Sequence, residues 1–505
     1  MKPDASREMA GSRRPLAEEF DVIVIGGGGS GLAAAAASAE AGARVLVLEK
    51  QSHLGGTTRL AVGSISAAGT RLQRAAGVDD APELFQDDMA AFTADLLPRD
   101  NERLRAMFAR EAGSTVDWLE RLGVAFVGPY PEPPHRVNRM HNAVPGPRLI
   151  VDRLARAARR GGAVIRTGVA TRALLREPEG RVAGVSYNAD GHVHLALARG
   201  GVILASGDFS GNDAMRFRHL ASGAARALPI NPHNQGDGFV LAQPTGAALR
   251  NMDAIFGPQL RFPRAAWRGL NEWMPAWPWL ARLSAQFFMK APSWMLKPLV
   301  TSLMIANMSP SEKLFEAGAV LVDSQGQRLD ARRPSESVAH TPDRTGYIVM
   351  DGLLADRLKA APHYISTAPG IAYAYLGDYE NGRPDLVHRA PDVATLAHRL
   401  AMDPGNLAAS LRSVTTGALL ALGPVQAMLT TTEGSLAVDD DCRVLDEQGR
   451  LVTGLYAVGC MGQGGMLLRG HGLHLAWAFT SGRVAGLRAA AAVTPEVPRA
   501  TLAAV

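Results

Sequence analysis

Cysteines, long apolar runs and blocks of like charge are all scarce or missing in this sequence. Its 505 residues include two cysteines, Cys442 and Cys460, too few for a disulfide framework, and no CxxC or Cys/His spacing typical of a metal site occurs. We therefore predict no bound metal and a reducing, cytoplasmic setting. Because no run of about 18 apolar residues occurs, we expect no segment to span a bilayer. The net charge of +5 is spread along the chain, without the dense basic blocks of nucleic-acid-binding proteins, so we predict no nucleic-acid partner.

The length and composition indicate a soluble globular protein with two or more domains. The chain is 47% hydrophobic and 20% charged, and 505 residues exceed what one ordinary core supports. The first segment, "MKPDASREMAGSRRPLAEEF", has an arginine pair but no apolar stretch behind it, so it is not a secretory signal and is expected to be a flexible tail.

A glycine-rich turn between two apolar stretches is the strongest signal in the sequence. The segment "DVIVIGGGGSGLAAAAASAE" places Gly26, Gly28 and Gly31 in the G-x-G-x-x-G spacing, after a short β-branched run and before an alanine-rich stretch. The first glycine permits a tight turn, the second lets the backbone approach a pyrophosphate, and the third lets a helix lie close to the strand. A helix that starts here presents free N–H groups and partial positive charge to phosphates. The pattern predicts a dinucleotide-binding unit.

The continuation of the chain favours FAD over NAD. A second predicted strand, "ARVLVLEK", ends at Glu49, where a carboxylate can accept hydrogen bonds from a ribose diol. The next segment, "HLGGTTRLAVG", is a second loop of small residues, whereas an NAD domain would normally run into another strand–helix–strand unit. Late in the chain, "GLYAVGCMG" is typical of an apolar strand that ends in Gly459, which lets the chain return to the cofactor.

Seven motifs together resemble one flavoprotein family. They are, in order, "VIVIGGGGSGLAAA", "LEKQSHLGGTT", "GVILASGDF", "NQGDGFVLA", "GAVLVDSQGQR", "TTEGSLAVD" and "GLYAVG". Their order and spacing resemble flavoproteins of the fumarate reductase/succinate dehydrogenase type, which include soluble fumarate reductases, urocanate reductases and ketosteroid dehydrogenases. The resemblance extends over roughly residues 20–490. It implies an α/β fold in which a Rossmann-like, glutathione-reductase-like FAD-binding domain is interrupted by an α+β capping domain, with substrate between them.

The resemblance also implies domain boundaries and cofactor-binding residues. The FAD-binding domain would comprise residues 20–255 and 431–490, the cap residues 256–430, and tails residues 1–19 and 491–505. The FAD is expected to be non-covalent, because Thr57 stands where membrane-bound relatives carry their flavin-linking histidine. Asp237 is expected to cap a helix as well. The residues expected at the cofactor are Gly26, Gly28, Gly29, Ser30, Gly31, Glu49, Lys50, Gly55, Gly56, Thr57, Thr58, Gly63, Val169, Ala170, Ser206, Gly207, Asp237, Gly459, Cys460, Gly472, Leu473 and His474.

The late segment "GMLLRGHGLHLAWAF" gathers cations directly before a predicted helix. The resemblance places Arg469 at the position of the arginine that grips a substrate carboxylate in fumarate reductases. Arg469 and His471 are thus candidate substrate anchors, and residues 472–474 open a helix whose N-terminus can stabilise negative charge on a reduced flavin. The alternatives are a surface charge for Arg469 and structural roles for His471 and His474.

The sequence departs from its fumarate-reducing relatives at several positions. Thr431, in "TTEGS", stands where that group has a substrate-binding histidine, and "GQRLDARRPSESVAH" offers no clear equivalent of its proton-donating arginine. A second histidine site of that group is expected to correspond to Ser309–Ser311, again without a histidine. An unpaired buried carboxylate costs several kcal/mol, and a single cationic anchor makes a dicarboxylate such as fumarate improbable. The Tyr-Pro-Gly-x-Gly pattern of the steroid-oxidising relatives is missing too, so steroid dehydrogenation does not simply carry over.

The sequence does not single out one proton-exchanging group. Tyr347 is named as a catalytic candidate together with Arg469 and His471. Other candidates in segments that could border the cleft are His340, Arg139, His141 and Tyr130.

A tryptophan-rich stretch falls inside the predicted cap. Five of the seven tryptophans lie between Trp267 and Trp294. The stretch is open to three interpretations: a cap core packed on itself, an apolar wall facing a bulky substrate, or a patch that rests on a membrane surface. The cations Arg282, Lys290 and Lys297 interleave with the aromatic residues, which suits the membrane interpretation.

The predicted function is an FAD-dependent oxidoreductase acting on a CH–CH or C=C bond next to a carbonyl or carboxylate. The substrate is expected to be rather apolar, a steroid-like ketone or a monocarboxylate, with dehydrogenation favoured. No haem-attachment motif or iron–sulfur cysteine set occurs, so an external electron acceptor or donor is needed. The alternatives are an ene-reductase of the fumarate or urocanate reductase type fed by an external donor, and an electron-transfer flavoprotein subunit.

Overall fold

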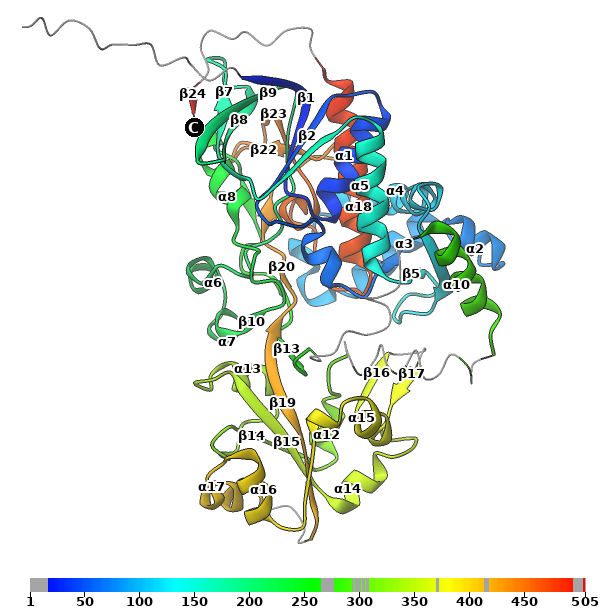
Figure 1. Cartoon of the computed structure of the whole chain (residues 1–505), viewed down its shortest axis with the longest axis vertical. Helices are drawn as coiled ribbons and strands as arrows, with labels where there is room; N and C mark the ends of the chain where they lie inside the picture. Colours follow the sequence, from blue (N-terminus) through cyan, green and yellow to red (C-terminus); the bar gives the residue numbers. More distant parts are fainter. Residues whose placement is uncertain are drawn as a thin grey trace, which may run out of the picture.

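The computed structural model describes residues 17–264, 277–292, 308–368, 372–412 and 417–493, together with residues 295, 301, 305 and 503–504. These residues form two lobes, with α1, α5 and α18 in the upper lobe and β14, β15 and β19 in the lower lobe (Figure 1). Most of the two predicted tails lies outside the described residues. So do the parts of the tryptophan-rich stretch that contain Trp267, Trp273, Trp294 and Lys297.

A parallel sheet forms the centre of the upper lobe. Its strands lie in the order β6 (Val164–Thr167), β2 (Val45–Glu49), β1 (Glu18–Ile25), β9 (His192–Leu204) and β23 (Leu451–Ala457). In this register Val24 pairs with Val47 and with Ile203. Residues 20–25 are all buried, as the lack of polar alternation predicts for a strand covered on both faces. Antiparallel strands extend the sheet: β8 (Val182–Ala189), β7 (Ala170–Arg176), β24 (Ala503–Ala504) and β22 (Arg443–Leu445).

Close helix packing explains the alanine-rich run after the glycines. The first helix, α1 (Gly29–Glu40), lies against α18 (Leu473–Ala491) at the other end of the sequence (Figure 1). A Cβ atom on Gly482 or Gly486 of α18 would collide with the backbone of α1, and the Ser38 hydroxyl donates a hydrogen bond to the Gly486 carbonyl oxygen at 2.9 Å. Only small side chains permit this approach, so the first and last helices of the lobe form one unit. α5 (Pro147–Arg160) and α4 (Glu102–Arg121) pack beside them.

A small antiparallel sheet lies beside this helical layer. It consists of β3 (Ser64–Ser66), β5 (Met140–Val144) and β4 (Ala125–Tyr130). In its register Met140 is opposite both Ser66 and Tyr130. The helix α10 (Pro278–Lys290), from the tryptophan-rich stretch, packs on β4 and β5 with Ala281 and Ala285 buried. The structure thus places this helix on the upper lobe.

The lower lobe is a second sheet with helices around it. Its strands are β10 (Leu228–Pro229), β19 (Leu419–Leu429), β15 (Thr345–Asp351) and β14 (Val320–Asp323), with β13 (Gln259–Arg261) and β18 (Val387–Ala390) also paired to β19. Two short pairings connect the lobes: β12 (Ile255–Phe256) with β20 (Thr431–Thr432), and β11 (Leu249–Arg250) with β21 (Ser435–Leu436). The helices are α12 (Lys313–Glu316), α13 (Pro334–Ala339), α14 (Gly352–Arg357), α15 (Leu376–Gly382), α16 (Val393–Leu400) and α17 (Pro404–Ser410), with the hairpin β16 (Ser366–Ala368) and β17 (Ala372–Ala374).

The remaining helices are short and mostly connect strands. They are α2 (Arg71–Ala75), α3 (Pro82–Ala91), α6 (Asp213–His219), α7 (Ser222–Arg226), α8 (Asp237–Ala242) and the 3₁₀ turns η1 (Gly56–Leu60), η2 (Ala94–Arg99), η3 (Gln243–Thr245), η4 (Pro384–Leu386) and η5 (Gly459–Gly462). Within the described part of the chain, no helix combines the length and apolarity needed to cross a bilayer.

Candidate active site

The turn between β1 and α1 has the geometry of a phosphate-binding loop. Gly26 has φ +108°, and a Cβ on it would collide with the Ala205 carbonyl group at the end of β9. A Cβ on Gly31 would collide with the carbonyl oxygen of Gly26. Gly28, which precedes α1, is different, because a Cβ there would meet no protein atom within 4 Å. The protein itself requires the first and third glycines, whereas Gly28 faces open space at a helix N-terminus, which fits a pyrophosphate.

The second glycine loop lies directly across from the first. The Gly55 N–H donates to the Gly27 carbonyl oxygen at 2.9 Å, and a Cβ on Gly56 would lie 3.4 Å from Gly28 Cα. On the opposite side, a Cβ on Gly29 would meet Thr58 and the Phe479 ring. Together the two loops present one continuous backbone surface around Gly28.

Thr57 and the end of β9 are tied together by amide side chains. Asn231 and Asn234 donate to the Thr57 hydroxyl at 2.9 and 3.0 Å. Asn234 also lies against Gly207, whose φ is +82°, and the Ser206 hydroxyl accepts the N–H of Gly238 at 3.0 Å. These bonds fix the loop positions that the sequence assigned to the cofactor.

Glu49 is held in place by the backbone of both loops. Its Oε2 accepts the Gly27 N–H at 2.6 Å and its Oε1 accepts the Gln51 N–H at 2.7 Å. Each oxygen keeps a lone pair that a ribose hydroxyl can use. The Val169 N–H donates to the Glu49 carbonyl oxygen at 2.9 Å, so Val169 and Ala170 lie beside the end of β2. The arrangement fits the nucleoside half of FAD.

The predicted capping role of Asp237 is wrong. Gly236, with φ +74°, precedes α8, and no side chain caps this helix. The Asp237 carboxylate instead pairs with Lys50 Nζ at 2.5 Å. Because the carboxylate points towards the end of β2, it ties that strand to α8.

The late strand β23 returns to the phosphate loop. A Cβ on Gly459, which follows β23, would lie 2.6 Å from Ser30 Oγ. The Gly459 N–H donates to Ser481 Oγ at 3.0 Å, which links the loop to α18. The next residue, Cys460, places its Sγ 3.7 Å from Thr431 Oγ1. The cradle is therefore built from both ends of the chain.

The N-terminus of α18 packs on β3. Gly472, with φ +81°, precedes the helix, and Leu473 is fully buried. The Ser66 N–H donates to the Gly472 carbonyl oxygen at 3.3 Å, and the Ser66 hydroxyl donates to the His471 carbonyl oxygen at 3.0 Å. Gly63, with φ +99°, lies just before β3 and contacts Pro147. The N-terminus of α18 and the start of β3, which Gly63 precedes, thus meet where the sequence predicts the flavin ring.

Arg469 is half-buried and held only loosely. Its Nη1 lies 3.3 Å from Oδ2 of Asp95, whose side chain is 70% exposed. Its Nε is buried and makes no hydrogen bond with the described residues. An exposed ion pair of this kind contributes about 0–1 kcal/mol. The guanidinium group is therefore available to an anion or a carbonyl oxygen.

The ring of His471 is held by the small sheet. Its Nε2 lies 3.1 Å from the Ser64 hydroxyl, which donates to Asn142 Oδ1 at 2.6 Å. Because that hydroxyl has a single proton, His471 Nε2 is the donor. Burial and the positive charge of Arg261 lower the pKa of His471. The ring is neutral and positions the segment around it.

His474 has the structural environment that the sequence left as an alternative. Its Nε2 lies 3.2 Å from the fully buried carboxylate of Glu433, which also accepts the Leu468 N–H at 2.9 Å. Its ring lies 5.6 Å from that of Phe256. His474 thereby joins α18 to the junction between the lobes.

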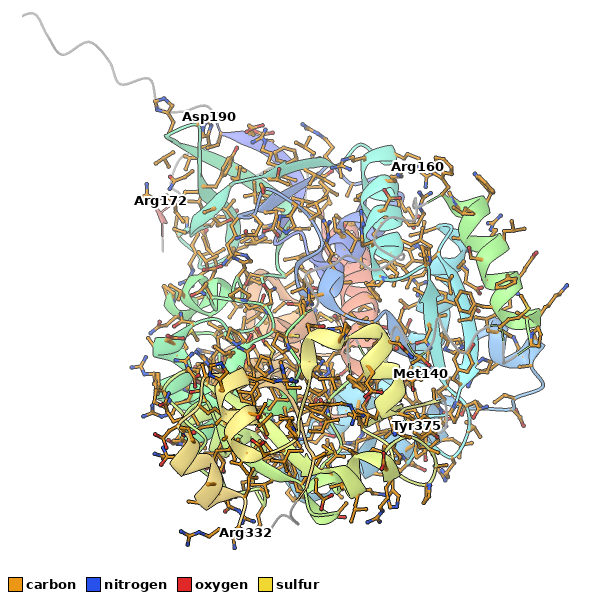
Figure 2. The ribbon with its side chains drawn as sticks, turned by 60° about the horizontal axis from the view of Figure 1, so that its bottom comes forward. Met140, Arg160, Arg172, Asp190, Arg332 and Tyr375 are labelled. Atoms are coloured by element: carbon orange, nitrogen blue, oxygen red, sulfur yellow. The ribbon has the colours of Figure 1, made fainter. Side chains whose placement is uncertain are left out.

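Tyr347 does not join Arg469 and His471. It lies on β15 in the lower lobe, where its ring lies 6.4 Å from that of His388 and packs against a separate cluster of buried residues. Arg332, in the "GQRLDARRPSESVAH" stretch, pairs with Asp330 and points away from the protein at the edge of the lower lobe (Figure 2). Neither side chain is brought to the loops around Gly28.

Three other proton-exchange candidates are engaged elsewhere. Arg139 is fully buried, with ion pairs to Asp80 at 2.7 Å and to Asp88. His141 Nε2 lies 2.9 Å from the Thr70 hydroxyl, and burial lowers the pKa of His141 to about 4. The exposed His340 contacts Ser222 at 3.1 Å. These side chains support the fold.

Thr431, at the position where the resemblance implies a histidine, completes a buried network of hydrogen bonds. Its hydroxyl donates to Asp208 Oδ2 at 2.5 Å. Asp208 also accepts the Thr432 N–H at 2.8 Å and the Asn234 amide at 2.6 Å. Because the Thr431 hydroxyl is used inside the protein, this position provides no substrate anchor.

Two residues at the site were missed by the sequence reasoning. Arg261, on β13, lies close enough to His471 to lower its pKa. Glu132, two residues after β4, receives a hydrogen bond from the His471 backbone, and burial raises the pKa of Glu132 to about 7. Arg261 belongs to no motif, and "YPEPPHR" around Glu132 carries no sequence signal, so only the tertiary fold identifies them.

Comparison with known proteins agrees with this geometry. Residues 21–272 match the FAD binding domain family. The chain is 23% identical to a probable fumarate reductase of Shewanella frigidimarina, over 88% of this chain and 70% of that protein. It is 23% identical to a 3-oxosteroid 1-dehydrogenase of Mycobacterium tuberculosis, over 88% and 92%. It spans 42–47% of the length of an NADH:fumarate oxidoreductase of Klebsiella pneumoniae and two cytochrome-type fumarate reductases of Shewanella frigidimarina.

The fold is likewise that of a known flavoprotein. The open conformation of a flavocytochrome c3 fumarate reductase superimposes with a TM-score of 0.72 and 22% identity, covering 94% of this chain and 79% of that one. The glycine cradle around Gly28 and the position of Glu49 fit FAD as the cofactor. The chain therefore belongs to the FAD binding domain family, and its relatives include fumarate reductases and 3-oxosteroid 1-dehydrogenases.

Proposed function

We propose that this protein oxidises or reduces a carbon–carbon bond next to the carbonyl or carboxylate group of a small, rather apolar substrate, with dehydrogenation as the favoured direction. Bound FAD would accept or donate the hydride. The observation that carries the proposal is Arg469, a half-buried guanidinium group with one weak partner, two residues before His471 at the N-terminus of α18. It would hold the carbonyl oxygen as negative charge develops on it.

The charge at the site bears on the substrate class. The sequence argument against dicarboxylates counted one cation, but the structure brings Arg261 close to His471 as well. A fumarate-type ene-reductase fed by an external donor therefore remains the second candidate. A monocarboxylate or a cyclic ketone needs one anchor, which Arg469 provides.

Anaerobic flavin spectroscopy tests this proposal. Oxidised enzyme would be mixed with 4-androstene-3,17-dione and with saturated monocarboxylates, and dithionite-reduced enzyme with fumarate and urocanate. Bleaching by the first group selects dehydrogenation, and reoxidation only by the second group selects the ene-reductase. If no compound in a broad panel changes the flavin, the chain acts as an electron-transfer subunit and the proposal is wrong.

A peripheral membrane contact also belongs to the proposal. On the exposed face of α10, Trp279, Leu283 and Phe287 are spaced four residues apart and are 61%, 59% and 49% exposed. Arg282 and Lys290 are exposed on the same helix. An apolar ridge with adjacent cations suits an anionic bilayer surface, where an apolar substrate would be concentrated.

Vesicle binding tests the membrane contact. The holoenzyme should sediment with phosphatidylglycerol vesicles more than with phosphatidylcholine vesicles, and a Trp279→Ser, Phe287→Ser double variant should lose this binding. Leu353→Ser is the matched control, because Leu353 on α14 is 71% exposed without such a ridge. Equal sedimentation of the double variant and the wild type would refute the contact.

The cytoplasmic location is kept as part of the proposal and is supported by two unpaired cysteines.

A further inference from the structure

Glu132 lies at the edge of the small sheet that holds the His471 segment. Tyr130 at the end of β4 is opposite Met140, and Met140 is opposite Ser66 on β3. Ser66 in turn binds the His471 carbonyl oxygen. The register therefore brings the residues after β4 to the segment between Arg469 and α18.

Two strand residues of the small sheet and Glu132, just after β4, hold the backbone and the ring of His471. Ser66 binds its carbonyl oxygen, Ser64 binds its ring, and the Glu132 carboxylate accepts its backbone N–H. Of these three partners, only Glu132 is ionisable. The His471 backbone thereby holds the Glu132 carboxyl group, and Arg469 precedes His471 by two residues in the sequence.

The environment of Glu132 differs from that of the structural acids nearby. Asp80 and Asp88 are ion-paired with Arg139. Glu132 is partly buried, its only resolved electrostatic partner among the described residues is the neutral His471 amide, and its pKa is raised to about 7 by burial. A carboxyl group that gains and loses a proton near neutral pH suits general acid–base catalysis.

We propose that Glu132 is the catalytic residue that exchanges a proton with the substrate carbon next to the carbonyl group. The assignment rests on the proposed function. In dehydrogenation, the C–H bond on that carbon breaks and its proton passes to the Glu132 carboxylate. Its electron pair forms the new C=C bond as the hydride of the neighbouring carbon leaves for the FAD, while Arg469 holds the carbonyl oxygen. In reduction every transfer is reversed, and Glu132 donates the proton.

The direction of the pH dependence follows from these roles. As a base, Glu132 must be ionised, so dehydrogenation should rise with pH through about 7. As an acid, it must be protonated, so reduction should fall through the same pH. Positioned acid–base groups typically contribute about 10²–10⁴-fold to rate.

The test compares Glu132→Gln, Glu132→Asp and the matched control Glu83→Gln, which makes the same change at an exposed position on α3. With a compound that the wild type converts, Glu132→Gln should lose at least about 100-fold in turnover, and its rate should no longer change near pH 7. Glu132→Asp should recover part of the rate, and Glu83→Gln should match the wild type. FAD content should be unchanged in all three variants. Wild-type turnover with an unchanged pH profile in Glu132→Gln would overturn the proposal.

A measurement without substrate separates this proposal from the proposed function. The absorbance of bound FAD would be followed from pH 5 to pH 9 in wild type and Glu132→Gln. A spectral change with a midpoint near 7 that disappears in Glu132→Gln places the ionisable carboxyl at the flavin, even if no substrate is found. An identical titration in both proteins shows that Glu132 does not face the flavin, and it overturns the assignment even when substrate is converted.

Discussion

Replacement of Gly28 and of Gly31 by alanine separates cofactor binding from folding. A Cβ on Gly28 meets no protein atom within 4 Å, and φ at this residue is −74°, which alanine adopts freely. A Cβ on Gly31 collides with the Gly26 carbonyl oxygen. Gly28→Ala should therefore leave the apoprotein intact and obstruct the pyrophosphate, whereas Gly31→Ala should damage the apoprotein itself.

The magnitudes follow from these contacts. Alanine at a helix N-cap costs about 0.5–1 kcal/mol relative to glycine, and the lower entropy of the unfolded chain offsets about 0.4–1 kcal/mol. The stability of the Gly28→Ala apoprotein should thus stay within about 0.5 kcal/mol of wild type. Overpacking at Gly31 should cost about 1–3 kcal/mol. A roughly 100-fold weaker FAD affinity removes about 2.7 kcal/mol of ligand stabilisation. Because the entropy of unfolding grows with chain length, this loss lowers the Tm of the Gly28→Ala holoprotein by about 2–5 °C.

Thermal unfolding of each variant with and without excess FAD, together with FAD fluorescence titration, measures both effects. Gly28→Ala should show a wild-type apoprotein Tm and a reduced shift on adding FAD. Gly31→Ala should have a lowered Tm in both states. Wild-type FAD affinity in Gly28→Ala, or an apoprotein as unstable as Gly31→Ala, would refute the assignment of open space at Gly28 to a phosphate.

Three further predictions concern charge and burial. Arg469→Ala should retain the FAD spectrum and lose at least about 100-fold in turnover. The control Asp95→Asn should change turnover by less than about 5-fold, because the ion pair between Asp95 and Arg469 is exposed. Wild-type kinetics in Arg469→Ala would contradict a role of Arg469 in holding the substrate. Burial raises the pKa of both thiols, that of Cys460 to about 12. Cys442 and Cys460 should therefore resist iodoacetamide at pH 8 in the native protein and react after unfolding. Rapid labelling of the folded protein, as measured by mass spectrometry, would contradict this prediction. Arg139→Met should lower the free energy of unfolding by about 3–5 kcal/mol in urea titration, because it leaves the buried Asp80 carboxylate without its cation, although Asp88 keeps Arg136. A loss below about 1 kcal/mol would show that the buried pair does not matter.

The phosphate loop was predictable because its constraints are local. The spacing of Gly26, Gly28 and Gly31 sets the backbone conformation of the turn and the close approach of the helix to the strand, all within six residues. The buried strand before this turn shows no alternation of polar and apolar residues. The return of the late chain was predictable for a related reason, since a strand followed by a glycine, here Gly459, is a local pattern.

The residues around the predicted substrate position were less predictable, because their neighbours are distant in sequence. Glu132 and His471 are 339 positions apart, and the contact depends on the register of β3, β4 and β5. Tyr347 was chosen as a tyrosine in a segment that could border the cleft, but the pairing of β14 and β15 places it elsewhere. Asp237 has the composition of a helix cap, yet a long-range ion pair with Lys50 decides its orientation.

The dependence of the cofactor cradle on β23 and α18 has a consequence for the order of events in the cell. A ribosome adds about 5–20 residues per second, so the segment with Gly26 and Gly28 emerges some 20–90 seconds before Gly459, which lies against Ser30. During that interval the dinucleotide cradle lacks one wall, and the surface of α1 that will contact α18 has no partner. Flavin capture is then a late step of maturation, and chains truncated before residue 451 should accumulate without colour.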